Sequence, residues 1–321
     1  MDSLEKAAPH VQSPDAADAP TESRPVVWLV ISSYRNDQEI LQTLEHVHLH
    51  QEKLFGQILV VDSEGTGEVP RMVAHRGWRD VTYRSYDVNL GSGANLRERL
   101  RLAAEGGADY AYAINHDASL DFRVVTALVE AARSIQNLGA AYPLAYFSSA
   151  GRYNLTGTRE LPLSRKLVAS VNQGPLIDVF WSSSNGALYS THPPKRGVLP
   201  WEEMWMGLED LEYGWRLSDH GYRQVIVTDA VFQDNNEYVS TKLGRVTSKP
   251  AWRTYYFSRN LILAIRRSRK RPLFFLVTAY RIVLEAGLIL LARSTKIQRL
   301  RYLWLGTIDG IRGAAVRRQI P

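Results

Sequence analysis

Short apolar runs rich in β-branched residues alternate with segments of helical period from residue 26 onward. Two of these runs, VVWLVIS (26 to 32) and QILVVD (57 to 62), are typical of strands. Between them, a helix beginning at Asp37 would carry one apolar stripe, formed by Ile40, Leu41, Leu44 and Val47. This order of elements predicts a βαβ unit at the start of a mostly parallel sheet flanked by helices.

The alternation continues to residue 147 and then becomes less regular. Further strands are predicted at 81 to 86, 109 to 115, 140 to 147, 176 to 184 and 222 to 232. Further helices are predicted from about Leu96 and over 122 to 138. Residues 148 to 176 hold many Ser, Gly, Asn and Pro residues without a clear period, which predicts a surface loop.

Composition adds limits to this α/β prediction. Residues 1 to 24 are rich in Ala, Pro, Asp, Glu and Ser and contain no apolar run suited to a signal peptide, so they are predicted to be a disordered tail. The 321-residue chain has no cysteine, which excludes disulfides, thiolate catalysis and Cys-ligated zinc. Any metal ion must therefore bind oxygen or nitrogen ligands.

Charge separates the C-terminal part of the chain from the rest. Residues 251 to 321 contain 15 Lys and Arg against two Asp and Glu, a net charge of +13, whereas the whole chain has +6. The mostly apolar stretch 272 to 293 lies within this basic part and is interrupted by Arg281 and Glu285. It predicts either a helix lying in a membrane interface or a helical hairpin packed on the catalytic domain, with Arg281 and Glu285 paired at i, i+4. No nucleic-acid-binding motif accompanies the basic residues.

Polar residues follow several of the predicted strands. Ligands of open α/β sheets bind at the carboxyl ends of the strands, so these side chains could converge on one ligand. The candidates are Ser33, Asp62, Asn89, Asn115, His116 and Asp117.

Two of these strand-end motifs have alternative interpretations. Asn115-His116-Asp117 could bind Mg²⁺ or Mn²⁺ through Asp117, but the residues alone favour a simple turn or a helix cap. The loop NLGSGAN (89 to 95) has Leu96 where a dinucleotide fingerprint has its third glycine, so a nicotinamide cofactor is not expected. The loop could contact a diphosphate through its backbone or form an ordinary tight turn.

Side chains elsewhere in the sequence also suggest chemistry. Glu209, Asp210 and Glu212 are close together where a helix is predicted to begin. Asp210 could be a general base or a helix N-cap, and Glu212 could form an i, i+4 salt bridge with Arg216. His46 and His50 could meet on one helix but have no third ligand nearby, which favours a solvated helix face.

The order of these motifs carries a resemblance to a known family. VISSYRND, VVDSEGTG, NLGSGAN, INHDAS, WSSSNGALYS and EDLEYGWRLSDHGY, followed by WRTYYFSRN and IDGIRG, span roughly residues 26 to 313. In this order they resemble the inverting glycosyltransferases of family 2, which have the GT-A fold, a Rossmann-like mixed sheet. The rhamnosyltransferase-like bacterial members that build surface polysaccharides are the most similar.

This resemblance implies roles for individual residues. It implies that Asp62 contacts the donor base, that Asn115 contacts its ribose or diphosphate, and that Asp117 binds the metal. The remaining donor-side contacts would come from Ser33, Tyr34, Asn89, Gly91, Gly93 and Asn95. On the acceptor side it implies that Asp210 is the catalytic base, with Glu212 beside it in the catalytic group. The remaining acceptor-side contacts would come from Ser184, Asn185, Gly186, Glu209 and Arg216.

The chain departs from the family pattern at two metal positions. Asn115 replaces the first Asp of the Asp-x-Asp motif, which removes one charge from the metal site. The motif VFQDNN places Asp234 near the position where many relatives have a metal-binding His, so Asp234 is a candidate substitute ligand.

The resemblance implies a transferase domain over residues 25 to 250, with a nucleotide-sugar half to residue 120 and an acceptor half after it. Residues 251 to 321 would form a basic, helical, membrane-associating segment. The expected substrates are a dTDP- or UDP-sugar donor and a saccharide or lipid-linked acceptor in cell-envelope polysaccharide synthesis, with Mg²⁺ or Mn²⁺ as cofactor. The expected location is the cytoplasmic face of the plasma membrane. The alternative is a membrane-associated nucleotide-sugar-binding protein without turnover.

Overall fold

The computed structural model describes residues 24 to 50, 54 to 158, 165 to 234, 238 to 241, 244 to 247, 250 to 267, 274 to 292 and 294 to 314. All but the last residue of the predicted N-terminal tail lies outside these residues. The strands are β1 (Val27–Tyr34), β2 (Gln57–Ser63), β3 (Val81–Tyr86), β4 (Tyr110–Asn115), β5 (Leu138–Phe147), β6 (Arg152–Thr156), β7 (Arg165–Val168), β8 (Leu176–Asp178), β9 (Ala187–Ser190), β10 (Arg223–Asp234), β11 (Tyr238–Thr241) and β12 (Gly244–Thr247). The helices are α1 (Asp37–Leu49), α2 (Glu68–Arg76), α3 (Gly91–Glu105), α4 (Phe122–Arg133), α5 (His192–Lys195), the 3₁₀ helix η1 (Glu202–Met204), α6 (Glu209–Asp219), α7 (Arg253–Arg267), α8 (Phe274–Ala292) and α9 (Lys296–Arg312).

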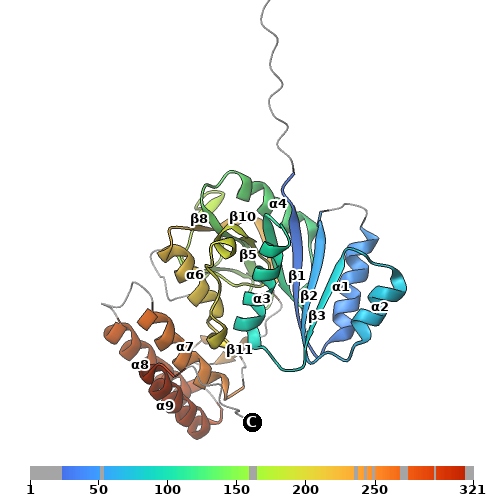
Figure 1. Cartoon of the computed structure of the whole chain (residues 1–321). Coiled ribbons are helices and arrows are strands. Elements are labelled where there is room, and N and C mark those ends of the chain that lie inside the picture. Colours follow the sequence, from blue (N-terminus) through green and yellow to red (C-terminus); the bar gives the residue numbers. More distant parts are fainter. Residues whose placement is uncertain are drawn as a thin grey trace, which may run out of the picture.

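A central mixed sheet organises the chain (Figure 1). Its order is β3-β2-β1-β4-β9-β5-β10-β8, and the neighbours β3, β2, β1 and β4 are parallel. β9 is antiparallel to both β4 and β5, and β10 is parallel to β5. Six strands therefore end at the same edge of the sheet, and the turn that precedes β9 lies at that edge too. This confirms the prediction of a mostly parallel sheet, and ligands of such sheets bind at the strand ends.

Helices cover both faces of the sheet. Alternate residues of β1 belong to opposite faces: Leu29 and Ile31 pack with α1 and α4, and Val30 packs with α3 and α6. Both clusters are almost fully buried, as expected of a sheet in which near-continuous apolar strands are covered on both sides. The βαβ unit predicted over residues 26 to 62 is confirmed.

Four local predictions differ from the structure. The strand predicted over residues 176 to 184 is β8, which ends at Asp178. The predicted loop over residues 148 to 176 contains the hairpin β6–β7, which extends the sheet from β5. The helix predicted from Leu96 begins at Gly91, where the Asn89 side chain accepts a hydrogen bond from the Gly91 amide at 2.8 Å. α4 ends at Arg133, and the sheet resumes at Leu138.

The three C-terminal helices pack together beside α6 and α3 (Figure 1). Two side chains of α7 donate hydrogen bonds to α9. The Tyr255 hydroxyl donates to the Asp309 carboxylate at 2.8 Å, and the Ser258 hydroxyl donates to the Leu303 carbonyl at 3.3 Å. Gly306 permits this close approach, because a Cβ there would lie 2.2 Å from the Ser258 oxygen. Among the described residues, no helix has both the length and the hydrophobicity needed to cross a bilayer.

Candidate active site at the strand ends

Asp62 is the next-to-last residue of β2 and lies directly beside Ser33 of β1. Its side chain is fully buried, and Oδ2 accepts a hydrogen bond from the Tyr83 hydroxyl at 2.7 Å. Oδ1 has no hydrogen-bond partner among the described residues. Burial raises the pKa of Asp62 above its usual value, and the Tyr83 hydroxyl opposes that rise. Tyr83 was not among the sequence candidates, since nothing in its own strand indicates a carboxylate partner.

Glu64 joins the loops that follow β1, β2 and β3. Its carboxylate accepts from Arg35 Nε at 2.8 Å and from the Asn89 amide at 3.1 Å. Arg35 and Glu64 both have positive φ, at 53° and 59°. Non-glycine residues adopt this conformation only when surrounding contacts hold them there, so the three strand-end loops form one connected rim. Tyr34 is 41% exposed on this rim, next to the buried Ser33.

The glycines of the NLGSGAN loop lie against the acceptor half of the chain. A Cβ at Gly91 would lie 2.3 Å from the Trp205 carbonyl oxygen, and one at Gly93 would lie 2.9 Å from the Trp201 carbonyl oxygen. These glycines therefore serve close packing of α3 on residues 201 to 205. Asn95 is 4% exposed and donates to the Val61 carbonyl at 3.0 Å, so its side chain holds β2 from inside the fold.

Asn115, His116 and Asp117 form a turn at the end of β4. The His116 amide donates to the Ser32 carbonyl at 2.9 Å, and the Ala118 amide donates to the Asn115 carbonyl at 3.1 Å. The Asn115 side-chain oxygen accepts from the Ser32 hydroxyl at 3.0 Å. Asp117 is exposed at the tip of the turn. The two sequence interpretations are thus compatible, because the turn presents a carboxylate at the strand-end edge.

The turn before β9 reaches this same point. The Asn185 side-chain oxygen accepts from the Asn115 amide at 2.9 Å, and the Gly186 amide donates to the Ala113 carbonyl at 2.8 Å. Gly186 has a φ of 81° and packs on Phe232. Ser184 closes the turn by accepting from the Ala187 amide. Residues 184 to 186, predicted for the acceptor side, therefore meet the predicted donor side directly.

The residues present give a single clear carboxylate for a divalent ion. Within the described ranges, no group of three His, Asp or Glu side chains is placed to hold a metal. Asp117 could supply one oxygen ligand, and Mg²⁺ commonly completes such a site with substrate phosphates and water. Asp234 pairs through its backbone with Phe147 at the end of β10. The Asp234 side chain lies outside what the structure describes.

α6 begins at Glu209, so Asp210 lies in its first turn and Leu208 occupies the N-cap position. The Glu209 oxygen Oε2 is buried without a hydrogen-bond partner among the described residues. Burial, followed by the charge of Asp210, raises the pKa of Glu209 to about 7. Asp210 is half-exposed, and the charge interactions of its carboxylate reach Tyr142 and Tyr189 in the acceptor half of the sheet. Asp210 is therefore the partly exposed carboxylate in the first turn of α6, and Glu209 precedes it with a buried oxygen.

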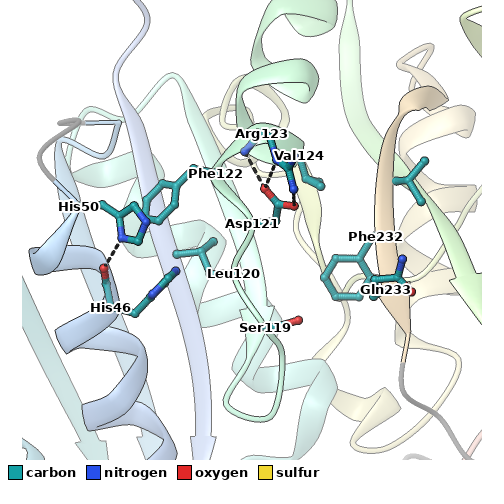
Figure 2. A pocket seen from close by; sticks show the side chains of 11 residues that line it. His46, His50, Ser119, Leu120, Asp121, Phe122, Arg123, Val124, Phe232 and Gln233 are labelled. Carbon is teal, nitrogen blue, oxygen red and sulfur yellow. Dashed lines mark hydrogen bonds and ion pairs between the residues drawn. The ribbon is translucent and has the colours of Figure 1, made fainter. Parts of the chain in front are cut away.

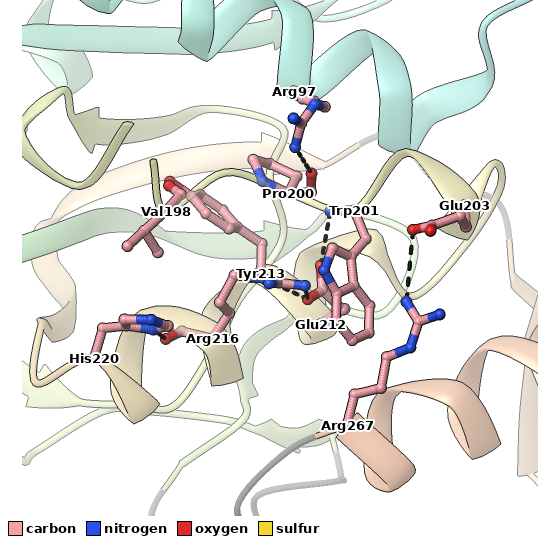
Figure 3. Close-up of polar contacts among 10 residues, drawn as sticks. All are labelled: Arg97, Val198, Pro200, Trp201, Glu203, Glu212, Tyr213, Arg216, His220 and Arg267. Carbon is pink, nitrogen blue, oxygen red and sulfur yellow. Dashed lines mark hydrogen bonds and ion pairs between the residues drawn. The ribbon is translucent and has the colours of Figure 1, made fainter. Parts of the chain in front are cut away.

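Glu212 lies in an interior network (Figure 3). It is 4% exposed and accepts from Arg216 Nε at 2.8 Å and from the Trp201 amide at 3.1 Å. The guanidinium groups of Arg216 and Arg267 lie 3.9 Å and 4.0 Å from the Trp201 ring centroid. Burial raises the pKa of Glu212 to about 7. The i, i+4 pair expected from the sequence is present, and it joins α6 to residue 201 and to the end of α7.

Arg99 is a site residue that the sequence did not indicate. It is 3% exposed on α3, and its guanidinium donates to the Val30 and Ile114 carbonyls at 3.1 Å each. Burial lowers the pKa of Arg99 to about 10, so the group stays cationic at neutral pH. A permanent positive charge therefore lies beneath the middle of β1 and close to the end of β4.

A cavity of about 520 Å³ lies beside the loop that follows Asp117 (Figure 2). His46, His50 and Phe122 form one wall, with the His50 and Phe122 rings stacked at a centroid distance of 4.4 Å. The two histidines, predicted to be a solvated helix face, thus meet each other and an aromatic ring. The described lining does not include Asp62, Asp117 or Asp210, but it does include Phe232, on which Gly186 packs.

The arrangement of strands and helices is similar to that of solved glycosyltransferase structures. Residues 1–349 of TarS from S. aureus superpose on this chain with a TM-score of 0.56 at 12% sequence identity. The superposition covers 89% of this chain and 81% of the TarS chain, and the same TarS segment has also been solved with UDP-GlcNAc. The mannosyltransferase PcManGT from Pyrobaculum calidifontis, in complex with GDP-Man and Mn²⁺, gives 0.52 at 15% identity, covering 92% and 90%. The chain has a GT-A fold. GalNAc-T7 with UDP, GalNAc and Mn²⁺ gives 0.55 at 9% identity, with 79% of this chain covering 50% of that one.

Sequence comparisons add no closer relative. No protein-family model matches the chain, and no curated protein matches it significantly. At identities of 9% to 15%, the structural similarity establishes the GT-A fold and leaves activity to be argued from the site.

Proposed function

We propose that the chain is an inverting glycosyltransferase of the family 2, rhamnosyltransferase-like type. It would transfer a sugar from a dTDP- or UDP-sugar to a saccharide or lipid-linked acceptor in cell-envelope polysaccharide synthesis. One observation carries the proposal: in a GT-A fold, the polar ends of β1, β2 and β4 share an edge with the turn at Asn185, and the start of α3 at that edge contacts the loop that leads into the α6 carboxylates. Ligands of such sheets bind at this edge.

The residues divide into a donor side and an acceptor side. Asp62 and the rim built on Glu64 suit the nucleoside, with Asn115 beside its ribose or diphosphate. Asp210 is the half-exposed carboxylate on the acceptor side, suited to take the proton of an acceptor hydroxyl. The hydroxyl oxygen attacks the anomeric carbon from the face opposite the departing nucleoside diphosphate. A single displacement of this kind inverts the configuration.

A divalent ion fits the donor side, with Asp117 as its protein ligand. The two structural neighbours with bound Mn²⁺ support a metal in this fold. Mg²⁺ or Mn²⁺ would supply neutralisation of the diphosphate charge. Arg99 adds a fixed positive charge from below the same strands.

The test compares Asp210→Asn with a matched change on the same helix, Asp219→Asn. Release of nucleoside diphosphate is measured with UDP- and dTDP-sugars, saccharide acceptors, and Mn²⁺ or Mg²⁺. We expect D210N to lower turnover by about 100- to 10,000-fold, the usual contribution of a general base. D219N should stay near wild type, and chelation of the metal should reduce turnover.

Wild-type turnover that persists in D210N would overturn the assignment of the base. Donor binding without turnover by the wild type, across the whole donor and acceptor panel, would favour the alternative of a nucleotide-sugar-binding protein. Asn115 in place of an acidic metal ligand is the observation that keeps this alternative under test.

We further propose that α8 and α9 rest on an anionic membrane surface, at the cytoplasmic face of the plasma membrane. Large apolar side chains are exposed on both helices, namely Leu276, Tyr280, Val283, Leu284, Leu290, Leu291, Ile297, Trp304 and Ile311. The exposed cations Lys296, Arg301 and Arg312 lie on the same pair of helices. Apolar side chains flanked by cations match an anionic interface, where a lipid-linked acceptor would be presented.

Because α9 packs on α7, deleting these helices would uncover the interior, and substitutions make a cleaner test. The triple variant Leu276→Ser, Val283→Ser and Leu291→Ser removes apolar contacts while leaving α9 in place. Leu49→Ser, at another highly exposed leucine, is the control. Co-sedimentation with phosphatidylglycerol vesicles should fall in the triple variant alone. Equal sedimentation of triple variant and wild type would refute the membrane proposal.

A further inference from the structure

The helix α7 binds the loop that leads into α6. Asn260 is fully buried, and its side-chain nitrogen donates to the carbonyls of Met204 at 2.6 Å, Met206 at 3.1 Å and Gly207 at 2.6 Å. The neighbouring Arg259, also fully buried, donates to the Glu203 carbonyl at 2.5 Å. The Asn260 side chain thus bonds three of the six backbone carbonyls of residues 203 to 208, a loop that no strand or long helix satisfies.

This loop has an unfavourable backbone conformation. Trp205 has a φ of 39° and Leu208 a φ of 63°, although neither is glycine, and Gly207 has a φ of 81°. Left-handed conformations cost about 1 to 2 kcal/mol for a residue with a side chain. The loop therefore keeps its shape through external contacts, among them the hydrogen bonds from Asn260.

Arg259 and Asn260 are held in turn by their surroundings. Arg259 Nε donates to the Asn260 side-chain oxygen at 2.9 Å, which leaves the Asn260 nitrogen facing the loop. The Arg259 guanidinium also lies 5.0 Å from the Tyr256 ring centroid. The orientation of the Asn260 amide is thereby set before it meets the loop.

The opposite side of the loop contacts the donor half. The Gly93 amide and the Ser92 hydroxyl both donate to the Trp205 carbonyl, at 3.3 Å and 3.2 Å. Two residues after the loop carbonyls held by α7, the chain reaches Glu209 and then Asp210. The loop is therefore clamped between α3 and α7, and it sets where the first turn of α6 begins.

We infer that Asn260, oriented by Arg259, is a positioning residue that holds residues 203 to 208 so that Asp210 faces the donor. This inference rests on the proposed glycosyl transfer and extends it to a residue outside the strand-end edge. Asn260 does not contact substrate; it acts through the loop backbone. A misplacement of about 1 Å in a catalytic group can lower a rate by about 100-fold.

The test uses Asn260→Ala, the milder Asn260→Ser, and the matched control Ser258→Ala. Ser258 is equally buried on α7 but bonds the Leu303 carbonyl of α9 instead of the loop. Three quantities are measured for each full-length variant: release of nucleoside diphosphate from UDP- and dTDP-sugars, donor affinity by calorimetry, and hydrogen exchange of the amides of residues 205 to 210.

We expect N260A to lower kcat by about 100-fold while donor Kd changes less than about threefold. Amide exchange in the loop should rise, and the pH dependence of kcat should shift because the surroundings of Asp210 change. N260S, which keeps one donor, should show a smaller effect of the same kind. S258A should leave kcat, the pH profile and loop exchange near wild type.

If the wild type turns over and both N260A and S258A keep a kcat near the wild-type value, the inference is overturned while the proposed function stands. If both variants lose kcat to the same extent, the inference is also overturned, since α7 would then act only through general stability. If N260A does not fold, N260S is compared with S258A in the same way, and that comparison decides. Donor binding without wild-type turnover would refute the proposed function, and the inference with it.

Discussion

Removing the Tyr83 hydroxyl provides a direct test of how Asp62 is held. In Tyr83→Phe, Oδ2 of a fully buried carboxylate loses the hydroxyl that lies 2.7 Å away. A hydrogen bond to a charged group contributes about 1.5 to 3 kcal/mol, so the folding equilibrium constant should fall about 10- to 150-fold at pH 7.5. The loss should be smaller at pH 4.5, because burial raises the pKa of Asp62 and a protonated carboxyl needs the hydroxyl less.

Urea unfolding at the two pH values measures this difference. The control is Tyr110→Phe, another half-buried sheet tyrosine, for which no side-chain hydrogen bond is found among the described residues. It should change the free energy of unfolding by less than about 0.5 kcal/mol. A loss in Y83F no larger than in Y110F, or one that is equal at both pH values, would refute the account of Asp62.

Two further predictions concern packing and pH. Gly91→Ala should destabilise the fold by about 2 to 4 kcal/mol, because the added Cβ would overlap Trp205. The control is Gly67→Ala, which is also at positive φ but has nothing within 4 Å, so it should cost only about 1 kcal/mol. Thermal unfolding of the two variants compares these losses of stability. Burial raises the pKa of Glu212 to about 7, so the folded state favours its protonated form, and this contribution to stability falls as pH rises from 4.5 through 7. Glu212→Gln should therefore flatten the wild-type loss of stability across that range, and an unchanged slope in urea titrations would count against it.

The alternating part of the chain was predictable because each element there follows a local rule. The strands around residues 26 to 62 and the helix between them follow from period and β-branching alone. The hairpin β6–β7 was missed because its strands are short, mix polar with apolar residues, and gain their order from pairing with β5. Pairing of that kind depends on a distant strand, so no local pattern reports it.

The site was predictable as a set of strand ends but not as a set of contacts. Position in the fold brought Asp62, Asn115 and Asn185 to one edge. The loop glycine Gly91 was expected to approach a diphosphate, but it packs against Trp205. A glycine in the sequence indicates that another group approaches the backbone closely, and it does not identify that group. The buried polar residues of α7 were equally hidden, because their partners are backbone carbonyls more than 50 positions away along the chain.

The interior placement of Arg99 affects how the site responds to its solution. Surface lysines attract anions through a field that dissolved salt weakens within about 10 Å at moderate ionic strength. Arg99 is held between two strand carbonyls under a protein layer, where mobile ions do not come between it and the strand ends. The positive charge of Arg99 therefore persists at high salt and at any pH well below 10. A nucleotide bound at the edge would keep this contribution even in a cell whose ionic strength fluctuates.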